Sequence, residues 1–427
     1  MLTYGTNLAV SVLSLVNVLV ISRALGPSAR GSVAFLITVA TMSGQFACLS
    51  VQEANANLGG SNAAARGRLA TNSLILAVVL GAVASIIVLG VVGVFPSVGG
   101  PVSRTLLLVA LAAVPFVIVK TYLSFLLQAE YAFISTNLAW LAGPLVGAAV
   151  NSAFALAGWL TIATAFVVWV GGQALGVVIL LVRVHRGAGL ARPDGRLAGD
   201  ALRFGMKTHP GRLMGMGNYR ADQWFVGSIS GSRELGLYSV ATSWAEMLFY
   251  LPGVLTLVQR PDLVRASPEE AARRAARVFR IASIATAVAA VGLIVVAPLL
   301  VTVAFGDAFA GAVPMLRVLA LGALGIAALD LLPNALTAQR MPIRAMWAIA
   351  VAFVVTLVLD ISLIPPFGGM GASVATAVAY SIGGVSAAVI FARTLHVPLH
   401  ALTPRLDELP WLWRKLRSLL RRAPERP

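Results

Sequence analysis

The chain has 427 residues, of which 59% are hydrophobic and 11% charged, and its mean hydropathy is +0.88. A soluble domain carries about 25% charged residues and keeps much polar surface in water, so this composition excludes a water-soluble fold. The single cysteine, Cys48, excludes an intrachain disulfide, and the four histidines lie at no spacing typical of a metal site. The net charge of +16 is therefore interpreted through membrane topology, and no nucleic-acid partner is expected.

Twelve apolar segments are long enough to cross a bilayer, which takes about 20 residues. Short breaks that carry glycine, proline or charge separate them, as at Gly26-Pro27 and at Pro365-Pro366. The first segment has no cleavage site behind it, so it is expected to stay as an anchor and not to be removed as a signal peptide. In chain order the predicted spans are 3–22, 32–51, 69–95, 104–127, 134–156, 160–182, 204–229, 236–258, 281–305, 313–336, 345–364 and 372–394.

The distribution of arginine predicts the orientation of these spans. With the N-terminus inside, the inner loops and the C-terminal tail hold 23 of the 32 lysines and arginines, and the outer loops hold 4. Both termini are therefore expected in the cytoplasm, and the protein in the cytoplasmic (inner) membrane of the cell. The basic loops are expected to contact anionic membrane lipids.

The C-terminal tail has a different pattern. From Leu409 onward, leucines and Trp413 recur at helical spacing with arginines and Lys415 between them. This pattern predicts an amphipathic helix that lies on the inner leaflet. Docking of a partner protein is the alternative role.

The chain repeats itself weakly at about half its length. Gly26-Pro-Ser-Ala-Arg-Gly31 aligns with Gly231-Ser-Arg-Glu-Leu-Gly236 at an offset of 205, and Thr164-Ala165 aligns with Thr376-Ala377 at an offset of 212. Two parallel halves of six helices normally enclose a central cavity that opens to alternate sides. The expected fold is an all-α membrane protein of about 12 transmembrane helices in two six-helix halves around a central cavity. Its expected parts are an N-terminal bundle 1–184, a basic cytoplasmic linker 185–203, a C-terminal bundle 204–395 and a cytoplasmic tail 396–427.

Away from the ends of the predicted spans lie nine charged residues, and a charge in hydrocarbon costs at least ~2.5–3.5 kcal/mol. They are expected to face a wet cavity or a partner, and snorkelling to the membrane surface is the alternative for each. The nine are Lys120, Lys207, Arg212, Arg220, Asp222, Glu246, Arg317, Asp330 and Asp360.

The seventh span, 204–229, is the least apolar of the twelve. Arg220 and Asp222 lie about halfway along it and, being two residues apart, point to different faces of a helix. Each needs a partner on another helix or a water-filled cavity. Three glycines loosen the same helix, so the sequence predicts a hinge or a cavity wall, with a helix shielded by structural ion pairs as the alternative.

Arginine in a cavity favours an anionic headgroup, because its guanidinium binds phosphate oxygens well and stays charged. Buried carboxyl groups could instead carry a coupling proton or sodium ion. No cofactor, metal ligand or catalytic residue is expected. The candidate substrate-binding residues are Arg220, Arg23, Arg212, Lys207 and Asn218. The candidate ion-coupling residues are Asp222, Glu246 and Asp330.

Three motifs resemble a known family. They are Ile21-Ser-Arg-Ala-Leu-Gly-Pro-Ser-Ala-Arg-Gly31, Arg220-Ala-Asp-Gln-Trp-Phe-Val-Gly with the following Leu235-Gly-Leu-Tyr-Ser-Val-Ala241, and Pro365-Pro-Phe-Gly-Gly-Met-Gly-Ala372. These segments look like the Wzx-like oligosaccharide flippases for polysaccharide biosynthesis, which belong to the multidrug/oligosaccharidyl-lipid/polysaccharide (MOP) exporter superfamily. The resemblance covers about residues 1–395.

The resemblance implies a flippase that moves a polyprenyl-pyrophosphate-linked oligosaccharide across the cytoplasmic membrane by alternating access. The implied partners are this anionic lipid-linked glycan, membrane lipids and polysaccharide-assembly proteins. A cation-coupled multidrug exporter of the MATE type is the alternative within the superfamily. A lipid II flippase is a further one, although those proteins usually have fourteen helices.

Two other classes of function fit the sequence less well. A membrane polysaccharide polymerase or glycosyltransferase needs a sizeable outer loop or a soluble domain, whereas the longest outer loop here, around 96–103, is short, and no Asp-x-Asp pair occurs. An enzyme is therefore not expected. A purely structural membrane scaffold is the remaining alternative.

Overall fold

A computed structural model describes residues 2–404, and the amphipathic helix predicted from Leu409 lies outside this range. Within these residues every regular element is helical, as expected. The helices are α1 (Leu2–Ala47), α2 (Val51–Ser61), α3 (Arg66–Val94), α4 (Arg104–Ala112), α5 (Val114–Gln128), α6 (Phe133–Leu156), α7 (Ile162–Arg186), α8 (Gly195–Phe225), α9 (Gly231–Ala245), α10 (Tyr250–Arg265), α11 (Pro268–Phe305), α12 (Ala312–Leu321), α13 (Ala323–Ala338) and α14 (Pro342–Thr394).

Among the described residues, eight helical stretches are long and apolar enough to cross a membrane, or nine if the bent pair α12–α13 is one crossing. Three of them are far longer than one crossing needs: Gly5–Ala47, Gly195–Arg265 and Pro342–Thr394. Glycines with positive φ interrupt these three, at Gly26 (φ 77°), Gly231 (φ 86°) and Gly368 (φ 57°). If each of these three counts as two crossings and the bent pair α12–α13 counts as one, the described residues hold the twelve crossings expected from the sequence.

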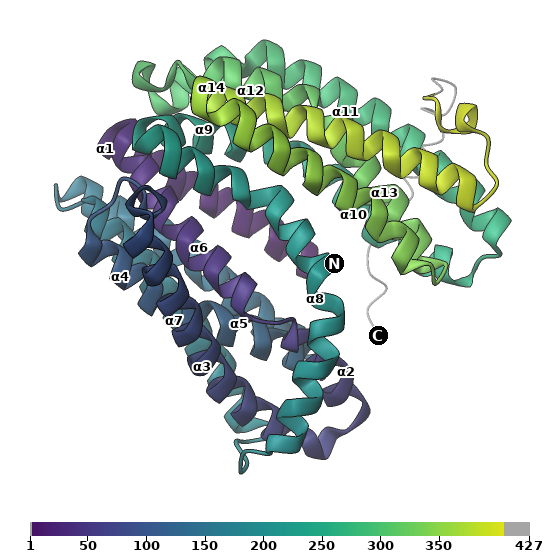
Figure 1. Ribbon diagram of the computed structural model, residues 1–427, viewed down its shortest axis with the longest axis horizontal. Coiled ribbons are helices and arrows are strands. Elements are labelled where there is room, and N and C mark those ends of the chain that lie inside the picture. The colour runs from purple at the N-terminus through teal and green to yellow at the C-terminus, as the bar shows by residue number, and fades with distance from the viewer. Residues whose placement is uncertain (1, 405–427) are drawn as a thin grey trace. The chain divides into compact units, whose positions relative to one another are not determined.

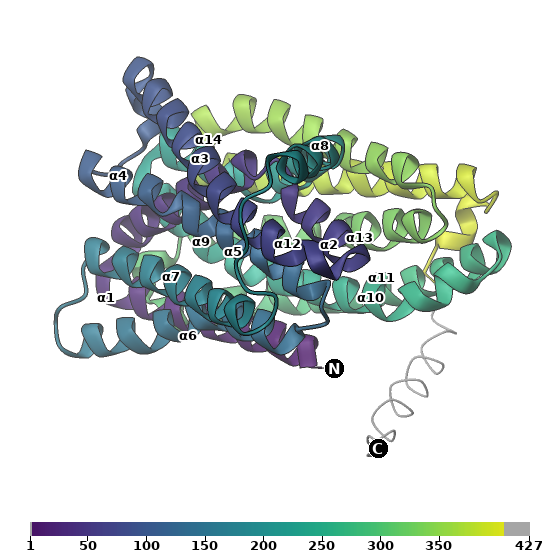
Figure 2. The ribbon, with the colours of Figure 1, turned by 90° about the horizontal axis from the view of Figure 1, so that it is seen from below.

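The first of two compact units contains the described residues up to Ser243, together with Pro298–Met315 and Leu359–Ala372. Within it α1, α6 and α7 lie side by side (Figures 1 and 2), and α5 packs against α2, α3 and α7. Small residues permit these close approaches, since a Cβ added at Gly172 of α7 would lie 2.8 Å from the Cα of Gly143 in α6.

Helix α8 also belongs to this unit and runs along α1 and α2. Near its beginning, Gly205 lies against the backbone of Leu49 and Ser50, and just beyond its end Gly227 lies against the ring of Phe35. A five-residue π-helical turn, Val226–Ser230, joins α8 to α9. Helix α8 and the turn after it therefore contact the chain at Phe35 in α1 and at Leu49 and Ser50, just after α1.

The second unit contains Trp244–Ala297, Leu316–Val358 and the described residues from Ser373 onward. Helix α10 packs against α13 within it. The first turns of α11 bury a face of alanines, among them Ala271 and Ala275, in a core shared with Leu332 and Leu336 of α13. Arginines 273, 274 and 277 occupy the exposed side of the same turns, so this part of α11 is amphipathic.

Large apolar side chains cover the outside of both units. Examples are Ile86 and Val94 on α3, and Val288 and Val295 on α11, all more than two-thirds exposed. Soluble proteins do not expose apolar surface of this extent, whereas a lipid-facing helix must. The protein is therefore a multi-pass membrane protein. The division into bundles 1–184 and 204–395 stays a prediction, because the compact units are set by helix packing and share α11 and α14.

Candidate functional site

The predicted site residues are distributed over both units. The first unit holds Arg23, Lys207, Arg212, Asn218, Arg220 and Asp222, and the second holds Glu246 and Asp330. Five of the first six follow one another along α8, which is the polar helix that the sequence singled out.

Helix α1 and the turn after it provide partners for several polar side chains of α8. The guanidinium of Arg212 donates to Gln45 Oε1 through Nε (3.2 Å) and a terminal nitrogen (2.8 Å). The ring of His209 lies 3.0 Å from the Ser50 hydroxyl on one side and 3.0 Å from the Phe46 carbonyl on the other. Satisfied in this way, polar groups can be buried between membrane helices at little cost.

Further along α8, Asp222 lies in a buried polar cluster. Its side chain is 4% exposed and accepts a hydrogen bond from the hydroxyl of Tyr238 in α9. On the neighbouring position, Gln223 accepts a bond from Thr38 of α1 at 3.1 Å. Asp222 was a candidate from the sequence and Tyr238 was not, although both belong to the motifs that carry the family resemblance.

A second carboxyl group, that of Asp360 in α14, is close enough to Asp222 for their negative charges to repel. Asp360 is fully buried, and neither of its carboxyl oxygens has a hydrogen-bond partner in the described part of the chain. Repulsion between two buried carboxyl groups is relieved when a proton or a small cation is bound. The sequence placed Asp360 among the membrane-depth charges without assigning it a role, because its distance to Asp222 depends on packing.

Two arginines lie near each other in the same unit. Arg220 is half-buried on α8, and Arg30 of α1 is close enough to it for their charges to repel. Arg30 is 7% exposed, and its Nε has no hydrogen-bond partner within residues 2–404. The sequence assigned Arg30 to an outer loop, whereas the structure includes it in α1, buried, so the cationic character of this region is greater than expected.

Arg23 and Lys207 lie apart from these clusters. The guanidinium of Arg23 donates to the carbonyls of Ala304 (2.6 Å) and Val303, the last turn of α11. Lys207 is exposed on α8 and makes no polar contact with any described residue. Asn218 is buried in α8, one turn before Asp222. Substrate binding by these residues stays a prediction.

The two candidates in the second unit lie on different elements. Glu246 begins the short 3-10 turn Glu246–Phe249 between α9 and α10. Asp330 lies within α13, and its backbone carbonyl accepts bonds from Thr256 of α10 (3.4 Å) and Asn334 (2.7 Å). Their ion-coupling role also stays a prediction.

Lys120 is the buried charge of α5. Its Nζ donates to Gln173 Oε1 of α7 at 3.1 Å and lies 4.4 Å from the centre of the Trp140 ring in α6. Gly176 leaves room for the lysine stem, because a Cβ there would lie 3.3 Å from Lys120 Cε. The sequence named this lysine among the membrane-depth charges, and only the packing shows how it is accommodated.

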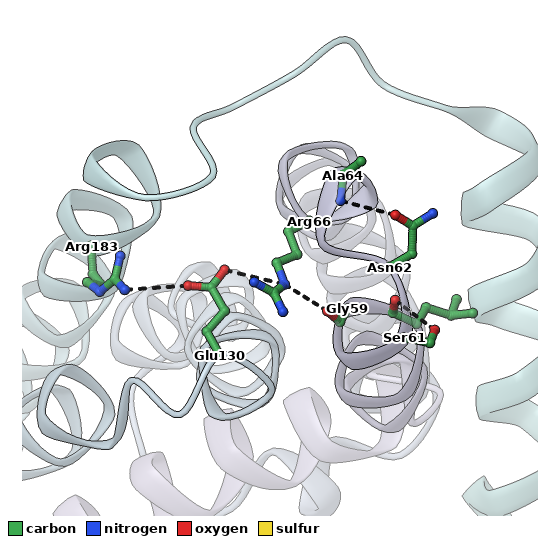
Figure 3. A network of polar contacts seen from close by, with 8 residues as sticks. Gly59, Ser61, Asn62, Ala64, Arg66, Glu130 and Arg183 are labelled. Carbon is green, nitrogen blue, oxygen red and sulfur yellow. Dashed lines mark hydrogen bonds and ion pairs between the residues drawn. The ribbon is translucent and has the colours of Figure 1, made fainter.

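An ion-pair network ties together the ends of α3, α5 and α7 (Figure 3). Glu130, just after α5, lies between Arg66 Nε (3.8 Å) and a terminal nitrogen of Arg183 (3.5 Å). Arg66 also donates to the Gly59 carbonyl at 2.7 Å. The network fixes three helix ends relative to one another within the first unit. No group of three His, Cys, Asp or Glu side chains within the described residues could hold a metal ion.

The comparisons with known proteins identify the family. Residues 20–314 match the profile of a family described as polysaccharide biosynthesis protein, which is more than half of the chain. The chain belongs to this family. Among curated proteins, none matches the sequence significantly.

Several solved structures have a similar fold. The lipid II flippase MurJ in an inward closed conformation has a TM-score of 0.75 at 13% identity, over 94% of this chain and 89% of that chain. An inward-facing MATE multidrug resistance transporter of the MOP superfamily has a TM-score of 0.69 at 15% identity, over 92% and 95%. A MOP superfamily transporter from Pyrococcus furiosus has a TM-score of 0.55 at 14% identity, over 94% of each. The polysaccharide biosynthesis protein therefore has the fold of MOP superfamily transporters, as the sequence motifs indicated.

Proposed function

We propose that the protein is a flippase that moves a polyprenyl-pyrophosphate-linked oligosaccharide across the cytoplasmic membrane by alternating access, for assembly of a cell-surface polysaccharide. One observation carries the proposal: a polysaccharide biosynthesis family profile covers residues 20–314 of a chain with a MOP transporter fold. A transporter fold in a polysaccharide pathway points to movement of a glycan intermediate. The proposed activity is therefore transport and not catalysis.

Electrostatics supports an anionic substrate. Arg220 and Arg30 concentrate positive charge in the first unit, and guanidinium groups bind pyrophosphate oxygens through parallel hydrogen bonds. The lipid tail would stay in the bilayer while the headgroup passes through a polar path. The proposed partners are the lipid-linked glycan, membrane lipids and the proteins that assemble the polysaccharide.

The paired carboxyl groups of Asp222 and Asp360 are the proposed coupling site for a proton or a sodium ion. Asp222 was a candidate from the sequence, and the repulsion between its charge and that of Asp360 supports Asp360 as the second carboxyl. Binding of a cation removes the repulsion between them, and its release restores that repulsion. The occupancy of the pair can thus bias the helices α8 and α14 between two arrangements.

Arg220→Ala tests the substrate role. Export of surface polysaccharide is expected to be lost while the protein remains in the membrane at normal abundance. Arg233→Ala is the matched control, because Arg233 is exposed and has no polar contact with any described residue. Unchanged polysaccharide export in Arg220→Ala would exclude Arg220 as a substrate-binding residue.

A cation-coupled multidrug exporter is the second candidate function. The likeness to MATE transporters and the Asp222–Asp360 pair favour it. In that case Asp222→Asn would abolish drug resistance conferred by the protein and leave the surface polysaccharide intact. Loss of peptidoglycan precursor transport in the same variant would instead indicate a lipid II flippase, the activity named for MurJ.

A further inference from the structure

The bend of α1, residues 23–31, is a meeting point for segments from the second half of the sequence. The beginning of α9 lies against it (Figure 1), and so does the end of α11, all within the first compact unit. The break of α14 in turn contacts α9 through Gly369 and Glu234, and just before α9 the Ser230 Oγ lies 3.5 Å from the Ile364 carbonyl. Four helices that are distant in the sequence thus converge at one point.

Backbones touch where α1 and α9 meet. A Cβ added at Gly31 would overlap the carbonyl oxygen of Ser232, and one added at Gly236 would overlap that of Pro27. Both glycines are therefore required by close approach, and no side chain or water fits between the two helices here. We call the contacts of residues 23–31 with residues 232–236 and 303–304 the seal.

Arg23 adds a polar bond to the seal. The last four carbonyls of a helix lack partners in the helix itself, and they carry the negative end of its dipole. The Arg23 guanidinium donates to two of these carbonyls of α11, those of Val303 and Ala304. A cation of α1 thereby caps the carboxyl end of α11.

Glu234 makes the complementary bond. Its Oε2 accepts the backbone N–H of Gly369 at 3.1 Å, directly after the break of α14 at Gly368. Here an anion caps the amino end of a helical segment, the arrangement that the helix dipole favours. The seal therefore joins helices through one capped carboxyl end and one capped amino end.

We propose that Arg23 and Glu234 are latches that hold the seal closed at one end of the transport path, an inference that rests on the alternating-access transport proposed above. Capping bonds suit this role. Arg23 is exposed and lies in the segment 23–31, which the sequence predicts to be an outer loop, so its guanidinium is expected to return to water when the bond breaks and to leave no buried charge. In this assignment Arg23 controls access and does not bind substrate.

Thiol labelling tests the latches without any substrate. In a full-length Cys48→Ala background, Ser32→Cys places a reporter beside Gly31, at a position that is 6% exposed in the sealed structure. The protein, reconstituted in lipid nanodiscs that expose both faces, is treated with a water-soluble maleimide. Arg23→Ala removes both hydrogen bonds to the end of α11 and is expected to raise the labelling rate at position 32 by at least roughly tenfold.

Matched variants distinguish local opening of the seal from a general destabilisation of the protein. Arg233→Ala removes an exposed arginine of the segment 232–236 whose side chain makes no polar contact with any described residue, and it is expected to leave labelling unchanged. Ser124→Cys, a fully buried reporter in α5, is expected to stay unlabelled in the presence of Arg23→Ala. Glu234→Gln, which keeps an acceptor but loses the charge, is expected to give a smaller increase and is also the second test if Arg23→Ala does not fold.

The outcomes are distinct. Equal labelling of Ser32→Cys with and without Arg23, or equal increases at positions 32 and 124, would overturn the latch. Loss of polysaccharide export leaves this result unaffected, because labelling reports opening and not transport. Conversely, a latch that opens as expected in a protein without flippase activity would refute only the proposed function.

Discussion

The hydroxyl of Tyr238 in α9 donates a hydrogen bond to the carboxylate of Asp222 in α8, and both side chains are buried. The two residues lie on either side of the π-helical turn Val226–Ser230 and the break at Gly231. The bond therefore ties together two helices that the chain itself leaves free to bend. The same bond holds the carboxylate of Asp222, one of the two acidic groups proposed as the coupling site, in place.

Tyr238→Phe removes this donor and leaves a buried carboxylate with one hydrogen bond fewer. We expect the unfolding free energy to fall by about 1–3 kcal/mol, measured as a lower unfolding temperature in detergent. Tyr131→Phe is the control, since Tyr131 is 83% exposed and should tolerate the change. An unfolding temperature that is the same for both variants would show that the Tyr238 bond contributes nothing to stability.

Gly31→Ala places a methyl group onto the carbonyl of Ser232. Overpacking of this kind costs roughly 1–3 kcal/mol, so we expect either a lower unfolding temperature or a seal that opens, detected by labelling of Ser32→Cys. Gly90→Ala in α3 is the matched change, because a Cβ there meets nothing within 4 Å. If Gly31→Ala behaves like Gly90→Ala in both measurements, the close approach of α1 and α9 does not exist in the membrane.

The buried Lys120 predicts a stabilising substitution. Lys120→Met together with Gln173→Leu replaces the ammonium and its amide partner by apolar groups of similar size. Such replacements of buried charge are neutral or stabilising by about 1–4 kcal/mol. Lys120→Ala, which removes the stem that fills the space beside Gly176, should lower the unfolding temperature instead. A destabilised double variant would mean that the charge itself contributes to folding.

Asp194 is expected to make a pH-dependent contribution to the folding stability of the protein. It is the N-cap of α8, and the hydrogen bond from the Leu197 N–H, with the nearby Arg68 (2.9 Å), holds the pKa of Asp194 below its usual value. A carboxyl whose folded-state pKa is lowered contributes stability above its unfolded pKa of about 3.9 and loses it as the pH falls through the folded value.

The pH dependence is measured with two variants. Asp194→Asn keeps a capping side chain but no charge, so its unfolding temperature should lie below wild type near neutral pH and converge with it below about pH 4. Asp194→Ala loses the cap as well and should remain less stable at every pH. A gap between wild type and Asp194→Asn that does not change with pH would refute the charge contribution.

Several features of the site could be anticipated from the sequence alone. The motif around Arg220 and Asp222 marked α8 as the polar helix, because charge at membrane depth is costly and needs a structural reason. By contrast, Asp360 received no role, since a single carboxylate in an apolar span does not indicate which helix it faces. Arg30 was assigned to a loop because it follows Gly26-Pro27. In the structure the helix resumes after Gly26, and Arg30 is buried in it.

The sequence by itself determined that this is an all-helical membrane protein of the polysaccharide biosynthesis family, because apolar run length and local motifs need no knowledge of packing. Only the tertiary structure decided which groups meet. The partners of Arg23 are backbone carbonyls at the end of α11, and those carry no side-chain signal in any sequence. Likewise, uniformly apolar helices leave their rotation undefined, so the meeting of Asp222 with Tyr238 and Asp360 was fixed by packing alone.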